Sequence, residues 1–162
     1  MILPASRRGG RGELNQHRPR PLLLDDRVLV ALLVGERLPI ARRAEHFTTT
    51  YFYYRACRAV VAGVGGHLSG PFERVDPDRR ALALEQMLAL PDDVRIPDSR
   101  YVVPVMVDVH RRHPNLSVLN IEAAATALWL GAKMVISPST ARGQLEGVLP
   151  VEHITFQTVD LP

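Results

Sequence analysis

LSVLNIEAAATALWLGAKMVIS, residues 116–137, is the segment of this 162-residue chain from which an architecture follows most directly. Ser117 and Asn120 are helix-capping residue types, and the alanine-rich run behind them ends at a glycine, Gly131. The next residues, KMVIS, form an apolar run typical of a strand that is buried on both faces. We therefore predict a helix over 121–130 that leads through a glycine turn into a strand of a parallel sheet.

The same alternation of strands and helices extends along the rest of the chain. Leu22–Leu24 form an apolar run that ends at Asp25 and Asp26, and a buried helix is expected over 28–34. The tips of parallel strands are where open α/β folds place their chemistry, so the two aspartates are candidate functional residues. The alternation predicts one domain of the α/β class over residues 22–162, a three-layer α/β/α sandwich with a mostly parallel central sheet.

The other elements follow from apolar periodicity and helix caps. Strands are expected at 47–49, 94–96 and 151–159, and helices at 51–61, after Asp78 and around Pro104. Asp78 is the expected N-cap of its helix, with Leu82, Leu84 and Leu88 on the buried face. Three glycines between residues 63 and 66 are expected to end the helix over 51–61.

The positive charge is concentrated at the N-terminus. Residues 1–21 hold five arginines and one acid, which leaves 15 basic and 16 acidic residues in the rest of the chain. A Gly-, Pro- and Arg-rich segment buries too little apolar area to fold, so we expect residues 1–21 to be a disordered leader. The alternative is an electrostatic arm for RNA or an acidic partner.

The composition excludes two other classes of protein. The longest apolar run, Val28–Val34, is far shorter than the roughly 20 residues that a membrane span needs, so no membrane segment is expected. The single cysteine, Cys57, excludes an intramolecular disulfide and favours a reducing, cytoplasmic setting, with Cys57 as a small buried side chain. His110 and His113 have a spacing that could hold a metal ion, but without a third ligand nearby we expect surface residues.

Three segments together resemble a PIN domain, the fold of the VapC-type ribonuclease toxins. They are LLLDDRVLVALLVGE at 22–36, FTTTYFYYRACRAV at 47–60, and the segment at 116–137. The resemblance implies a PIN-like sandwich in which a cluster of carboxylates holds Mg²⁺ or Mn²⁺. Such an ion prefers anionic oxygen ligands, and it activates water for hydrolysis of RNA.

Only part of that carboxylate cluster is present in this sequence. Asp25 matches the first acid of the family, but Arg55 stands where the second is expected and Asn120 where the third is expected. Ser137 and Ser139 follow the strand where the family usually has another aspartate. The resemblance therefore gives Asp25 and Asn120 as catalytic candidates, Asp25, Asp26, Asn120 and Glu122 as metal ligands, and Arg55, Ser137 and Ser139 as other residues of the cleft.

Two of these residues have a further interpretation. Glu122 lies about 200° around the helix from Asn120, so its alternative role is a first-turn acid favoured by the helix dipole. Arg55 could pair with Asp25 across the former metal site, because a lone carboxylate in a cleft needs a partner or a raised pKa.

Three hypotheses follow. The first is a PIN-like protein of impaired catalysis that binds RNA or protein. The second is an active Mg²⁺- or Mn²⁺-dependent endoribonuclease of the VapC type with an altered metal shell. The third is an unrelated α/β domain with a regulatory role. The expected partners are RNA, an antitoxin-like protein and a second copy of the chain in a homodimer. The aromatic run at 51–54 supports a contact surface, because its four rings cannot all point inward from one helix.

Overall fold

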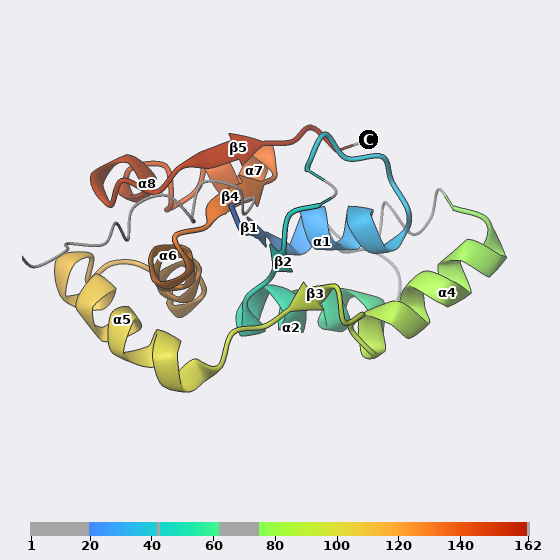
Figure 1. Ribbon diagram of the computed structural model, residues 1–162, viewed down its shortest axis with the longest axis horizontal. Coiled ribbons are helices and arrows are strands. Elements are labelled where there is room, and N and C mark those ends of the chain that lie inside the picture. The colour runs from blue at the N-terminus through green and yellow to red at the C-terminus, as the bar shows by residue number, and fades with distance from the viewer. Residues whose placement is uncertain (1–19, 42, 62–74, 162) are drawn as a thin grey trace, which may run out of the picture.

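The protein is a three-layer α/β/α sandwich around a five-stranded sheet, seen in a computed structural model that describes residues 20–41, 43–61 and 75–161 (Figure 1). The strand order is β3-β2-β1-β4-β5, and every pairing is parallel, which confirms the predicted fold class. The strands are β1 (Leu22–Leu24), β2 (His46–Phe47), β3 (Val94–Arg95), β4 (Lys133–Ile136) and β5 (Phe156–Thr158). The helices are α1 (Asp26–Leu33), α2 (Thr50–Val61), α4 (Pro77–Leu88), α5 (Ser99–Arg112), α6 (Val118–Leu130), α7 (Pro138–Ala141) and α8 (Val148–Val151).

The two faces of the sheet pack against different helices because side chains alternate along each strand. Leu23 and Met134 lie in the core cluster that includes the buried residues of α5 and α6. Leu24 and Val135 lie in a second cluster, with Val28 of α1. Figure 1 accordingly shows α5 and α6 on one side of the strands and α1 and α4 on the other.

The helix α6 and the strand β4 form as the sequence predicts. Ser117 caps α6, its side chain accepting a hydrogen bond from the Asn120 N–H, and Gly131 closes the helix in the left-handed conformation at φ 59°. The alanines of α6 are buried, which lets the helix pack closely on α5 and the sheet. Strand β4 then pairs with β1 and β5.

The helix α4 differs from the prediction in its cap and in its buried face. Its N-cap is Asp76, which accepts from the Arg79 N–H, and the helix starts at Pro77. The buried residues are Ala83 and Met87, whereas Leu82 is 53% and Leu88 62% exposed. Leu84 is half-buried at the edge of the contact with α1 and α2. The prediction was wrong because it ranked residues by apolarity, while the i, i+4 pair of Ala83 and Met87 faces the neighbouring helices.

The helix α2 carries the aromatic run and exposes part of it. Thr49 caps the helix by accepting from the Phe52 N–H, and Phe52 is fully buried. Tyr53 is half-buried and donates to the Met87 carbonyl, as does the half-buried Cys57. The other two rings, Tyr51 and Tyr54, are exposed, as expected for four consecutive aromatic residues on a helix.

The structure differs from the prediction near both ends of the described chain: residues just before β1 contact the fold, and the last strand is shorter than predicted. Arg20, placed in the expected leader, donates to the Gly131 carbonyl and to Thr155 Oγ1, and the Pro21 carbonyl accepts from Lys133 N–H. The last strand, β5, begins at Phe156 rather than at residue 151, because α8 extends to Val151 and a turn at residues 152–153 follows it. Residues 1–19 of the leader and the glycines at 63–66 lie outside the described residues. Within the described ranges no helix is long and apolar enough to cross a membrane.

Candidate functional site

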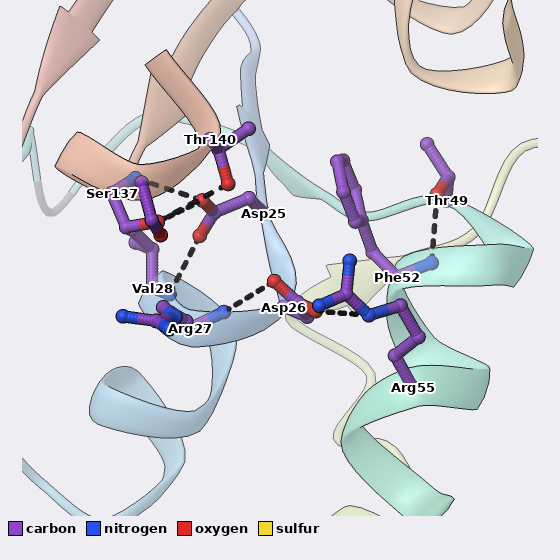
Figure 2. Close-up of polar contacts among 10 residues, drawn as sticks. Asp25, Asp26, Arg27, Val28, Thr49, Phe52, Arg55, Ser137 and Thr140 are labelled. Carbon is purple, nitrogen blue, oxygen red and sulfur yellow. Dashed lines mark hydrogen bonds and ion pairs between the residues drawn. The ribbon is translucent and has the colours of Figure 1, made fainter. Parts of the chain in front are cut away.

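The candidate site lies at the carboxyl edge of the sheet, where the strand order reverses. Strand β1 has β2 on one side and β4 on the other, so connections leave its tip in opposite directions. Ligands of open α/β sheets bind at such a point. Asp25, Asp26 and Ser137 follow the ends of β1 and β4 there, and Arg55 reaches the same point from α2 (Figure 2).

Asp25 is fully buried, and both of its carboxylate oxygens are engaged by the chain itself. Oδ1 accepts from the Val28 N–H at 2.8 Å, which makes Asp25 the N-cap of α1. Oδ2 accepts from the N–H and from the hydroxyl of Ser137, both at 2.8 Å. Three donors around one carboxylate satisfy both of its oxygens and join the tips of β1 and β4.

The hydroxyl groups of α7 continue this network toward the surface. Ser137 Oγ lies 3.1 Å from Ser139 Oγ and 3.1 Å from Thr140 Oγ1. Since an ionised Asp25 only accepts, the Ser137 O–H donates to it, and the two outer hydroxyls donate to Ser137 Oγ. Ser139 and Thr140 are then left with lone pairs for any further partner.

Asp26 pairs with Arg55, which corrects the expected pairing of Arg55 with Asp25. Asp26 Oδ2 lies 2.9 Å from Arg55 Nε, and Oδ1 accepts from the Arg27 N–H at 3.0 Å (Figure 2). Arg55 and Asp26 therefore form an ion pair. Their groups are not aligned for a hydrogen bond, and Oδ2 has no hydrogen-bond partner among the described residues. Neighbouring residues at a helix start point about 100° apart, so Asp25 faces β4 while Asp26 faces α2.

The environment of Asp26 raises the pKa of its carboxyl group despite the ion pair with Arg55. Burial raises the pKa of Asp26 from 3.8 to about 6, and the negative charge of Asp25 adds to the rise. The charge of Arg55, the N–H of Arg27 and the charge of Arg27 oppose the rise. Arg55 therefore offsets only part of the cost of burying a second carboxylate beside the first.

A cleft of about 420 Å³ opens outside these carboxylates. Four of the predicted site residues line it, namely Asp26, Arg55, Asn120 and Ser139, while Asp25 and Ser137 are buried. The amide of Asn120 donates to Ser117 Oγ at 3.0 Å and to Gln144 Oε1 at 2.8 Å, so it is held within the wall of the cleft. Arg27, which the sequence did not single out, is a further lining residue.

Glu122 does not join this cleft. Its side chain accepts from the N–H groups of Thr50 at 3.1 Å and Tyr51 at 2.9 Å, and so stabilises the N-terminus of α2. Glu122 is buried and lines a separate, more apolar pocket beside α5. The dipole that it serves belongs to α2, whose own first turn holds no acid. Nothing in the local sequence indicated that this acid would come from α6.

The two histidines at the end of α5, His110 and its C-cap His113, lie in different surroundings. His110 is exposed, as expected. His113 Nε2 lies 2.7 Å from Glu152 Oε1, and Arg112 contacts the same carboxylate. This cluster ties the end of α5 to α8, a contact that the spacing of the histidines did not indicate.

The donor set in the cleft does not match that of a Mg²⁺ or Mn²⁺ site. Such ions take several anionic or carbonyl oxygens in near-octahedral geometry. Here the oxygens of Asp25 are occupied by three donors, and Asp26 is in contact with a guanidinium. Across the part of the chain that the structure describes, no group of three or more His, Cys, Asp or Glu side chains could hold a metal ion.

Comparisons with known proteins give a structural similarity but no family. The sequence matches no protein-family model, and no curated protein matches it. Among solved structures, the chain is similar to a chain of VapBC-1 from nontypeable Haemophilus influenzae, with a TM-score of 0.47 and 9% identity. The match covers 85% of this chain and 96% of that chain. At this level the similarity assigns neither a family nor an activity.

Proposed function

We propose that the protein is a PIN-like binding module that does not hydrolyse RNA with a divalent metal. The ion pair between Asp26 and Arg55, at 2.9 Å, carries this proposal. A divalent cation about 5 Å from the guanidinium would be repelled by roughly 7 kcal/mol at an effective dielectric constant of about 20. The two carboxylates would have to overcome that repulsion and also give up their present contacts.

A binding role agrees with what the cleft presents to solvent. Its charged lining residues are Asp26, Arg27 and Arg55, so cations outnumber acids there. Exposed aromatic rings at Tyr51 and Tyr54 on α2 add area that can stack on bases or pack on a protein. The partners proposed for the module are RNA, an antitoxin-like protein or a second copy of the chain.

The test combines Mn²⁺ binding with RNA cleavage. We expect single-stranded RNA to remain intact with the purified protein in Mg²⁺ or Mn²⁺, and no Mn²⁺ binding by calorimetry. Arg55→Glu replaces the repelling cation with a third acid and is expected to gain Mn²⁺ affinity. Arg55→Gln is the matched control, since it removes the cation without adding an acid.

The competing hypothesis is the active endoribonuclease with an altered metal shell. Metal-dependent cleavage by the wild-type protein that disappears in Asp26→Asn would establish it and refute our proposal. A melting curve for each variant shows that the loss is not due to unfolding.

A further inference from the structure

We propose that the cleft binds a phosphate group between the guanidinium groups of Arg27 and Arg55. The inference rests on the proposed function, because a metal ion held by Asp26 would occupy the same space. Three observations support it: a cation whose guanidinium group makes no hydrogen bond or ion pair in the described ranges, a second cation that is only partly engaged, and the charge of the lining.

Arg27 is the less engaged of the two cations, because its charge acts on Asp26 without an ion pair among the described residues. Its side chain is half-buried and lines the cleft. Within residues 20–41, 43–61 and 75–161, no hydrogen bond or ion pair engages its guanidinium group. The N–H donors of this half-buried guanidinium group are therefore available to an anion that enters the cleft, which gains hydrogen bonds that the described residues leave unmade.

Arg55 is the partly engaged cation. Its Nε lies 2.9 Å from Asp26 Oδ2, and its side chain is 44% exposed. Figure 2 shows a terminal nitrogen of the guanidinium turned away from Asp26. The N–H donors of that nitrogen are therefore available to a ligand while Nε contacts Asp26.

The charge and geometry of the lining favour a phosphate over other ligands. Asp26 is the single acid among the lining residues, and the charge of Asp25 behind it is met by three donors. Arg27 and Arg55 approach from different helices, α1 and α2. A phosphate can accept from both because its oxygens are tetrahedral, whereas the two oxygens of a planar carboxylate are satisfied by one guanidinium fork.

The experiment titrates the full-length protein with inorganic phosphate by calorimetry, beside sulfate and acetate. Arg27→Gln is expected to weaken phosphate binding at least about 10-fold, because it removes a charge-assisted hydrogen bond to the anion. Asp26→Asn removes the single lining acid and is expected to strengthen binding about 10-fold, by the same scale of charge interaction. The matched control is Arg142→Gln, because Arg142 is exposed, does not line the cleft, and its side chain donates to the Pro138 carbonyl.

The opposite signs of the two effects separate a binding role from a structural one. Unchanged phosphate affinity in Arg27→Gln, weaker binding in Asp26→Asn, or acetate bound as tightly as phosphate would each overturn the inference. A competing single-stranded oligonucleotide would assign the phosphate to a nucleic-acid backbone, and competition by a nucleoside monophosphate alone would assign it to a small molecule.

A Mn²⁺ titration of the same samples separates this inference from the proposed function. Absence of both phosphate and Mn²⁺ binding refutes the phosphate site and leaves the proposed function standing. Binding of Mn²⁺ by the wild-type protein refutes the proposed function itself.

Discussion

Replacing Asp26 by asparagine should stabilise the protein at neutral pH and leave it nearly unchanged at acidic pH. The pKa of Asp26 rises from 3.8 to about 6 on folding, so between these values the folded protein binds more protons than the unfolded chain. Stability therefore falls as pH rises through this interval, and the penalty is fully present above about pH 6. A shift of about 2 units at about 1.36 kcal/mol per unit gives a penalty of about 3 kcal/mol.

Asparagine has the shape of the neutral acid and does not titrate, so it removes this penalty. We expect the free energy of unfolding of Asp26→Asn, minus that of the wild type, to rise by about 3 kcal/mol between pH 4 and pH 8. Urea denaturation at each pH measures the difference. Glu152, whose lowered pKa gives the opposite dependence, is common to both proteins and cancels.

Arg55→Gln provides a second arm of the same experiment. The charge of Arg55 lowers the pKa of Asp26, so its loss should raise that pKa further and increase the total loss of stability between pH 4 and pH 8 relative to the wild type. A difference between Asp26→Asn and the wild type that does not change with pH would refute the reasoning. So would a variant that is less stable, relative to the wild type, at pH 8 than at pH 4.

Three further substitutions test other contacts by urea denaturation at pH 7. Glu122→Gln should lower stability by about 1–3 kcal/mol, because it removes the charge that accepts two N–H groups of α2. The exposed Glu146→Gln is its control, and equal midpoints for the two would contradict the capping role. Ser137→Ala should cost about 1–3 kcal/mol, since it removes one of three donors to a buried carboxylate, and an unchanged midpoint would show that the bond to Asp25 contributes nothing. Gly131→Ala should cost about 1 kcal/mol because of the left-handed backbone, and no loss would contradict that conformation.

The parts of the fold that local sequence determines were the parts that could be predicted. Ser117, Gly131 and the apolar run after it act within a few residues of one another, so their meaning did not depend on the rest of the chain. The buried face of α4 could not be predicted from local sequence. Ala83 and Met87 are buried because α1 and α2 happen to lie against them, while more apolar leucines remain exposed.

In the candidate site, too, the features set by local sequence were predicted and those set by distant contacts were not. The sequence predicted Asp25 and Asp26 at the end of a strand, because the end of an apolar run can be recognised from neighbouring residues alone. It did not show which of the two would meet Arg55, since that depends on the direction in which each side chain leaves the start of α1. Nor did it show that Glu122 would cap α2, a contact between residues 71 and 72 positions apart.

The position of β1 between β2 and β4 has a consequence for biosynthesis. The bonds that join the tips of β1 and β4 connect residues 112 positions apart, so most of the chain must leave the ribosome before the sheet can close. Until then Leu22–Leu24, an entirely apolar strand, presents an unpaired edge. Contacts of such long sequence separation form slowly, and nascent or truncated chains that end before Lys133 would expose this edge to chaperones and to one another.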